Sequence, residues 1–114
     1  MIDNTNGATA ADYVDLTPDA LIFVSTPARD STVTSPVRVA GTSDTFEATF
    51  QLEVHAAGKP VQTKIVTATA GSGTRGRWSV TLALPRGDVT LVLYEASAED
   101  GSHLHTTEVP LHVQ

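Results

Sequence analysis

Cysteine is absent from this chain of 114 residues, which excludes a disulfide framework, a thiolate metal site and a cysteine nucleophile. Aromatic residues are scarce, at 5% of the chain, whereas 40% of the residues are hydrophobic. A core must therefore consist mainly of valine, leucine, isoleucine and alanine, a composition that favours β-strands. The length is that of one ordinary domain with a single core.

Lysine and arginine are also few, because seven of them stand against 13 acidic residues and leave a net charge of −6. No basic patch rises above this background, so nucleic acid and an anionic membrane surface are not expected partners. Long hydrophobic runs are lacking too, since none approaches the ~20 residues that span a bilayer, and no signal-peptide pattern opens the chain. We expect a soluble domain that does not insert into a membrane.

The first 19 residues differ from the rest of the chain. They are rich in Asp, Thr, Asn and Ala, carry four acids and no lysine or arginine, and lack a hydrophobic period. Such a segment cannot bury enough apolar surface to offset the entropy that is lost on ordering. We therefore interpret residues 1–19 as a disordered linker or a remnant of recombinant expression, and residues 20–114 as one domain.

Short segments with the character of β-strands recur through residues 20–114, separated by turn-forming glycine and proline. In the clearest segment, apolar and polar side chains alternate, which places one set on each face of a strand. Its expected inward residues are Phe46, Ala48, Phe50, Leu52 and Val54. The seven predicted strands lie within residues 21–24, 36–41, 46–56, 61–70, 77–84, 89–96 and 106–113. No window has helical spacing, so the prediction is an all-β sandwich of two packed antiparallel sheets.

A family resemblance rests on four stretches of the chain, residues 35–50, 76–82, 94–102 and 109–113. In this order they resemble the immunoglobulin-like domain of bacterial spore germination. The resemblance covers about residues 21–113. It implies an immunoglobulin-like sandwich with a binding or scaffolding role at the cell envelope, often C-terminal to a GerMN-type domain in extracytoplasmic proteins or lipoproteins. It implies no reaction and no cofactor. Antigen-type recognition does not follow, because a cysteine pair is missing and Trp78 lies on the fifth predicted strand instead of the third.

Two patterns suggest ligand sites but have simpler explanations. Gly71, Gly73 and Gly76 spell the G-x-G-x-x-G of a dinucleotide-binding turn, yet the next segment alternates like a strand, which favours a hairpin loop. His103 and His105 lie two residues apart, with two further histidines elsewhere in the chain. A stable zinc site needs three or four ligands at fixed spacing, so we interpret all four histidines as surface residues.

The loop near residue 100 contains residue types that occur in catalytic and calcium sites. Asp100, Ser102 and His103 are the residue types of a catalytic triad, but neighbours in one loop rarely have room for successive hydrogen bonds, and an Asp-Gly turn explains them better. Glu99 and Asp100, with Asp44, could bind calcium, although calcium takes six or more oxygens. We therefore predict no metal and no catalytic residue here.

Two glutamates, Glu47 and Glu95, are each flanked by apolar residues within a predicted strand. A carboxylate in that position must face solvent or meet a hydrogen-bond donor. If Arg38 or Arg77 shares their sheet face, these side chains, with Asp100 nearby, form a polar interaction patch. Cross-strand ion pairs or solvated positions are the simpler interpretation.

We do not expect an aromatic surface on which a sugar could stack. Trp78 shares its strand face with large aliphatic residues, which predicts burial, and Tyr94 is expected to be structural as well. The expected function is therefore a noncatalytic interaction or spacer module of an extracytoplasmic bacterial protein, associated with sporulation or germination or with a lipoprotein. Its expected partner is another protein or a cell-envelope component. The alternative is a module that binds cell-wall polysaccharide or peptidoglycan.

Overall fold

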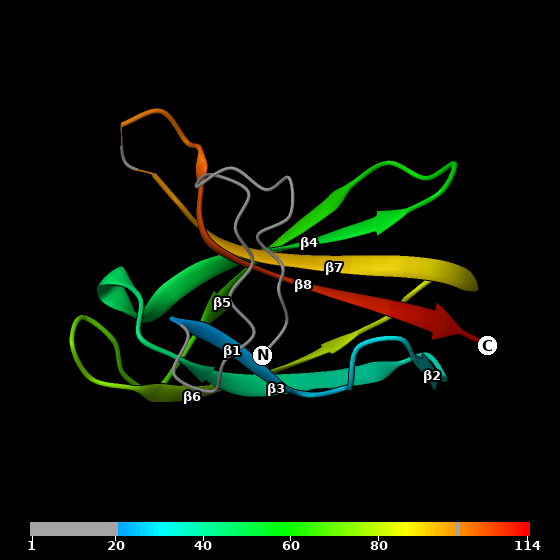
Figure 1. Ribbon diagram of the computed structural model, residues 1–114, viewed down its shortest axis with the longest axis horizontal. Coiled ribbons are helices and arrows are strands. Elements are labelled where there is room, and N and C mark those ends of the chain that lie inside the picture. Colours follow the sequence, from blue (N-terminus) through cyan, green and yellow to red (C-terminus); the bar gives the residue numbers. More distant parts are fainter. Residues whose placement is uncertain (1–20, 98) are drawn as a thin grey trace, which may run out of the picture.

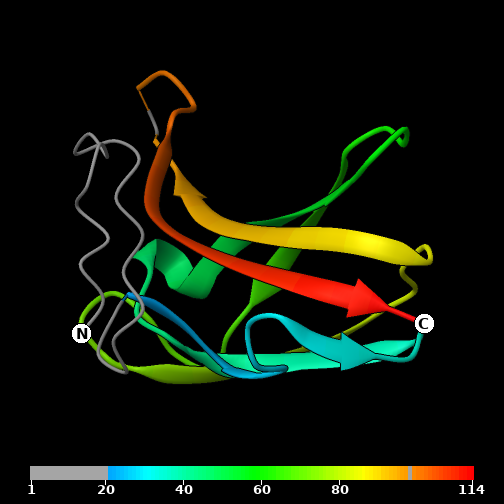
Figure 2. The same ribbon diagram turned by 45° about the vertical axis from the view of Figure 1, so that its right-hand side comes forward.

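The computed structural model describes residues 21–97 and 99–114, which form two β-sheets packed face to face (Figure 1). The linker expected in residues 1–19 lies outside these described residues. One sheet has three strands in the order β1-β3-β6, and the other has five in the order β2-β8-β7-β4-β5. Figure 2 shows the two sheets as separate layers, with β7 and β8 over β3. The predicted all-β, immunoglobulin-like sandwich is confirmed.

The strands have the following bounds. The three-stranded sheet contains β1 (Ile22–Thr26), β3 (Val37–Ser43) and β6 (Gly76–Leu82). The five-stranded sheet contains β2 (Ser31–Val33), β4 (Thr49–Ala56), β5 (Gln62–Thr67), β7 (Gly87–Ala96) and β8 (His103–Val113). The described chain therefore has eight strands, one more than the sequence predicted.

The additional strand is β2, which pairs with β8 in parallel and is the exception to the antiparallel arrangement that the sequence predicted. Pro27 directly follows β1, and the chain then passes from the three-stranded sheet to the five-stranded sheet. The backbone N–H of Asp30 donates to the carbonyl of Pro110, 2.7 Å away, and fixes this passage. A strand of three residues is too short to show a hydrophobic period, which is why the sequence did not reveal it.

The core lies between the two sheets and contains three of the five residues that alternation in residues 46–56 predicted for it. Phe50, Leu52 and Val54 of β4 are buried, and the Phe50 ring meets Trp78 edge to face with centroids 5.3 Å apart. The central strand of the larger sheet is β7, and Leu91 in its middle is fully buried. Trp78 is 4% exposed, so its predicted place in the core is confirmed.

Prediction fails at the beginning of β4. Residues 46–48 continue the alternating pattern in the sequence, but in the structure they form a short 3-10 turn, η2 (Phe46–Ala48), and the strand begins at Thr49. Glu47 and Ala48 have φ values of 55° and 63°, a left-handed conformation that does not occur in the regular part of a strand. Phe46 is consequently 70% exposed instead of buried.

The loop at residues 71–76 is also different from the prediction. It connects β5 to β6, which belong to different sheets, so it is a crossover between layers and not a hairpin. A Cβ atom on Gly71 would lie 2.3 Å from the Thr45 carbonyl oxygen and 2.6 Å from the backbone of Ala48. Gly71 therefore allows this loop to pack directly against the turn at 46–48.

A bulge divides β7 and β8 into two parts. Leu93 pairs with Thr107, whereas Glu95 pairs with Leu104, so β8 contains one more residue than β7 between the two pairs. His105, within this interval, has a φ of 55°. An extra residue shifts the alternation of side chains along the bulged strand. The bulge thereby brings His103, opposite Ala96, onto the same outer face as Tyr94.

Candidate functional site

Histidine and carboxylate side chains are paired across the five-stranded sheet. All four histidines of the chain lie on β4 or β8, and each has a ring nitrogen within 4 Å of a carboxylate oxygen. The pairs are His55 with Glu53 at 2.7 Å, His103 with Glu53 at 3.7 Å, His105 with Glu95 at 3.6 Å and His112 with Asp88 at 2.8 Å. The expectation that the histidines lie at the surface is confirmed, since their side chains are 43–52% exposed.

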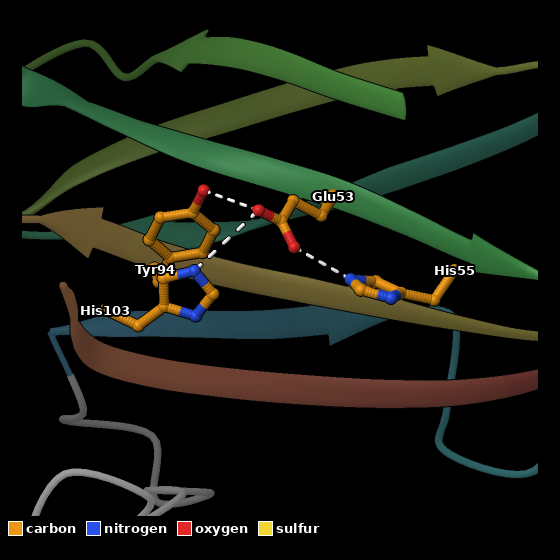
Figure 3. A network of polar contacts seen from close by, with 4 residues as sticks. All are labelled: Glu53, His55, Tyr94 and His103. Atoms are coloured by element: carbon orange, nitrogen blue, oxygen red, sulfur yellow. Dashed lines mark hydrogen bonds and ion pairs between the residues drawn. The ribbon is translucent and has the colours of Figure 1, made fainter. Parts of the chain in front are cut away.

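The densest of these contacts is the Glu53 cluster, which comprises Glu53, His55, Tyr94 and His103 (Figure 3). Glu53 and His55 are two residues apart on β4 and point to the same face. The Tyr94 hydroxyl donates to Glu53 Oε2 at 2.7 Å, and His55 Nε2 is 2.7 Å from Glu53 Oε1. The His103 ring stacks on Tyr94 with centroids 3.6 Å apart and an angle of 18° between the planes.

The pKa values of the Glu53 carboxyl and the Tyr94 phenol both lie further from neutral pH than usual. Burial raises the pKa of Glu53, but the hydrogen bonds from Tyr94 and His55, with the nearby histidines, lower it overall below its usual value. Burial, together with the hydrogen bond to Glu53 and its charge, raises the pKa of Tyr94 to about 12. Glu53 is therefore a stable carboxylate acceptor and Tyr94 a stable phenol donor. The expected structural role of Tyr94 is confirmed, because the residue is 7% exposed and its hydroxyl is hydrogen-bonded.

A pocket of about 300 Å³ lies beside this cluster, between the beginning of β4 and the ends of β7 and β8. We call it the Phe46 pocket. Its lining residues are Phe46, Thr49, Gln51, Glu95, Ala96 and Leu104. Gln51 pairs with Tyr94 across the sheet, so the pocket and the Glu53 cluster are direct neighbours. Phe46 and Leu104 are two of the four large hydrophobic residues that are exposed in the described chain.

Glu95 joins the two sides of the Phe46 pocket. Its Oε2 accepts a hydrogen bond from the backbone N–H of Phe46 at 2.7 Å, and its Oε1 is 3.6 Å from His105 Nε2. The prediction that a carboxylate here must face solvent or meet a donor is confirmed. The Glu95 side chain is 18% exposed, so it remains within reach of a ligand in the pocket.

The turn that carries Phe46 is held from several directions. The backbone N–H of Glu47 donates to Ser72 Oγ at 3.1 Å, and the N–H of Ser72 donates to the Thr45 carbonyl at 2.9 Å. The carbonyl of Ala48 accepts from the N–H of Ala68 at 2.8 Å. These bonds come from the end of β5 and the loop after it, and together they fix a turn that the backbone would otherwise avoid.

The predicted interaction patch is not brought together on one face. Arg38 and Arg77 are exposed residues of β3 and β6 in the three-stranded sheet, whereas Glu95 belongs to β7 of the other sheet. Glu47 is exposed in the turn beside Phe46, and Asp100 lies in the β7–β8 loop. Only the two glutamates border a common feature, the 46–48 turn.

The carboxylates of Asp100 and Asp44, which lie in loops, accept hydrogen bonds from backbone N–H groups. Asp100 Oδ1 accepts from the backbone N–H of Ser102 at 2.9 Å, a bond that lowers the pKa of Asp100, and Asp44 Oδ1 accepts from the N–H of Gly73 at 2.7 Å. The predicted turn at Asp100 is confirmed. Within residues 21–97 and 99–114, no group of three or more histidine, aspartate or glutamate side chains is placed to hold a metal ion.

Most of the described residues match the model of a known protein family. Residues 21–102 match the family model of the immunoglobulin-like domain of bacterial spore germination. The chain belongs to this family. The matched residues of this spore-germination immunoglobulin-like domain include Phe46, Glu53 and Glu95, and they end one residue before His103. A search among curated proteins found no match. In the described part of the domain, no helix has the length and apolar character needed to cross a membrane.

Sequence reasoning singled out Glu95 but missed the other main residues of the site. The alternation of residues 46–56 predicts Phe46 for the core and leaves Glu53, at an intervening position, on the polar face of the strand. The Glu53-x-His55 spacing was a usable signal, because residues i and i+2 of a strand share a face. The bulge at His105 had no signal, since no glycine marks its left-handed residue.

Proposed function

We propose that the domain is a noncatalytic interaction module of an extracytoplasmic bacterial protein, and that its partner is a protein that binds at the Phe46 pocket. Membership of the spore-germination immunoglobulin-like family supports a noncatalytic module in general. The family resemblance also supports a place outside the cytoplasmic membrane, in a protein associated with germination or anchored as a lipoprotein.

The observation that carries the proposal is the exposure of Phe46. Phe46 is 70% exposed although it costs free energy to leave an aromatic side chain in water, and a hydrogen-bonded turn holds the residue there. Aromatic residues beside a pocket are typical anchors of protein interfaces. A fixed anchor also loses little conformational freedom when a partner binds, which favours affinity.

The protonation states in the Glu53 cluster support a noncatalytic role. A general base or acid works best when its pKa lies near the working pH. The pKa of Glu53 is lowered and that of Tyr94 is raised to about 12, so both groups are moved away from neutrality. Their mutual hydrogen bond also occupies the atoms that would have to transfer a proton.

The test is photo-crosslinking in cells that produce the complete parent protein. Benzoylphenylalanine replaces Phe46, which keeps an aromatic ring at the pocket, and in a matched variant it replaces Thr81 on the outer face of β6 in the other sheet. We expect one discrete adduct with an envelope protein from position 46 and none from position 81. Equal adducts from both positions, or none from position 46, would contradict the proposal.

Three further measurements separate the proposal from its competitors. The purified domain should remain in the supernatant when it is sedimented with purified peptidoglycan, and pelleting with it would favour cell-wall binding instead. A protease added to protoplasts should degrade the domain, whereas protection until lysis would place it in the cytoplasm. Turnover of a defined substrate by the domain would contradict its noncatalytic role.

A further inference from the structure

We propose that the Phe46 pocket binds the side chain of a lysine or arginine that the partner protein presents. The inference rests on the proposed function and specifies the chemistry of the residue that enters the pocket. It follows from three features of the pocket, namely its mixed walls, the free capacity of its carboxylate and its strained backbone.

The walls of the pocket suit a long side chain with a charged end. Phe46, Leu104 and Ala96 form an apolar part, and the Glu95 carboxylate is the one ionised group among the lining residues. Lysine and arginine carry an apolar stem that packs on hydrophobic surface and a cationic end that pairs with a carboxylate. A cation beside Phe46 also gains from the negative face of the aromatic ring.

The Glu95 carboxylate has acceptor capacity left for such a cation. One oxygen accepts the Phe46 N–H, and the other is 3.6 Å from His105 Nε2, which is longer than a hydrogen bond. An ionised carboxylate offers about four lone-pair positions. Among the described residues that line the pocket, none is lysine or arginine, so the chain supplies no permanent countercharge there.

Charge excludes the opposite kind of ligand. Residues 20–114 contain nine acidic residues and seven lysine or arginine residues, a net charge of −2, and Glu47 adds an exposed carboxylate on the turn beside the pocket. A phosphate, an acidic peptide or an acidic polysaccharide would meet like charges at close range. A cationic partner gains from the two carboxylates of Glu95 and Glu47.

Backbone strain is concentrated at the same place. In the described part of the chain five non-glycine residues have positive φ. None of them lines the pocket, but Glu47, Ala48 and His105 are next to lining residues in the chain, and Ser72 is hydrogen-bonded to Glu47. Left-handed conformations of such residues persist only where surrounding contacts enforce them, and they gather at functional sites. Here they hold the Phe46 ring and the Glu95 carboxylate in one fixed arrangement, as a preorganised binding pocket requires.

The experiment is an NMR titration of the uniformly 15N-labelled chain with two matched probes. The first is Nα-acetyl-lysine methylamide, which keeps the ammonium group, and the second is the same compound with its Nε acetylated and therefore neutral. We expect saturable shifts of the Phe46, Glu95 and Leu104 amides by the first probe, with a Kd of about 1–10 mM for so small a ligand. The neutral probe should shift these signals without saturating.

Variants decide whether the pocket is responsible. Glu95→Gln removes the charge but keeps an amide oxygen that can accept the Phe46 N–H, and we expect affinity for the cationic probe to fall about tenfold. Glu108→Gln removes the same charge from an exposed position of β8 outside the pocket and should change affinity less than about twofold. Phe46→Leu keeps an apolar side chain without a ring and should weaken binding about threefold.

Several outcomes would overturn the inference: equal affinity for both probes, unchanged binding by Glu95→Gln with its amide spectrum otherwise intact, or absence of saturable shifts. A crosslink from position 46 without lysine binding would leave the proposed function standing and remove only this inference. Lysine binding without any crosslink would show that the pocket binds a cationic side chain and would contradict the proposed protein partner.

Discussion

The five-stranded sheet has a pocket at each end of β4, and the two pockets are nearly equal in size but different in chemistry. The Phe46 pocket measures about 300 Å³, and the pocket at the opposite end about 320 Å³. The second pocket is lined by Val54, Ala56, Lys59, Pro60, Gln62, Ala83, Leu84 and Pro85 and contains no carboxylate. Volume therefore does not distinguish the two ends, whereas charge does.

The backbone conformation also differs between the two ends of the sheet. Near the second pocket, positive φ values fall on Gly58 and Gly87, where they cost little because glycine has no Cβ atom. Around the Phe46 pocket, glutamate, alanine, serine and histidine adopt them. The two turns beside the second pocket thus use glycine, whereas non-glycine residues adopt the left-handed conformation near the Phe46 pocket. Backbone strain and a lining carboxylate therefore lie at the same end of the sheet.

The largest effect should come from the buried middle of the sheet, which connects the two ends. Leu91 is fully buried on the central strand β7. We expect Leu91→Ala to lower the free energy of unfolding by about 2–5 kcal/mol, because it removes buried apolar contacts and leaves a cavity. Phe46→Ala, at an exposed position, should change it by less than about 0.5 kcal/mol. Urea denaturation measures both, and a comparable loss for the two variants would show that Phe46 is part of the core.

A second substitution tests whether the strained end depends on close packing. Gly71→Ala would place a Cβ atom 2.3 Å from the Thr45 carbonyl oxygen, so the backbone of the turn has to move. We expect a loss of about 1–3 kcal/mol in thermal or urea unfolding. Gly73→Ala is the control in the same loop, since nothing lies within 4 Å of its added Cβ and only its φ of 103° is unfavourable. A smaller loss for Gly71→Ala than for Gly73→Ala would contradict the close packing.

Tyr94 lies where β7 passes from its regular part to the pocket, and its ionisation should weaken the sheet at alkaline pH. Its pKa is raised from 10.0 to about 12, so its stabilising contribution is complete below pH 10 and is lost as the pH rises towards 12. The stability difference between the native chain and Tyr94→Phe should therefore shrink by up to about 2 kcal/mol over this range. Urea unfolding of both proteins at several pH values measures it. A difference that stays constant would rule out the raised pKa.

Glu53 provides the corresponding test on the acid side, with a smaller effect. Its pKa is lowered from 4.5, so its contribution is present above pH 4.5 and is lost as the pH falls through the lowered value. The native chain should be more stable than Glu53→Gln by about 0.5–1 kcal/mol at pH 7, and the two should converge in acid. If they diverged on acidification, the carboxylate would be destabilising in the folded domain.

The regular parts of this domain could be predicted from the sequence, and the strained parts could not. Alternation located Phe50, Leu52 and Val54 correctly, because a buried strand face imposes a period of two. The same rule misplaced Phe46, since hydrogen bonds from the distant residues Ser72 and Glu95 override the local pattern. Sequence periodicity reports burial along one strand and carries no information on such long-range bonds.

The candidate site was predictable only in its charged component. Glu95 was recognisable as a carboxylate in an apolar context, and the family was recognisable from separated segments. The pairing of Glu53 with Tyr94 needed the register of β4 against β7. The position of His103 needed the bulge in β8, which no residue type announces. Local rules are expected to fail at functional sites, and Phe46, which the alternation misplaced, lines the candidate pocket.

Amide hydrogen exchange at Phe46 tests most directly the claim that the free domain already holds its strained end in place. The Phe46 N–H donates to Glu95 Oε2 at 2.7 Å, so its exchange should be clearly slower than in an unstructured peptide. Glu95→Ala removes the acceptor and should abolish this protection while the amides of Leu52 and Leu91 remain protected. Exchange of the Phe46 amide at the unstructured rate in the native chain would show that the turn is not held, and the account of a preformed pocket would be wrong.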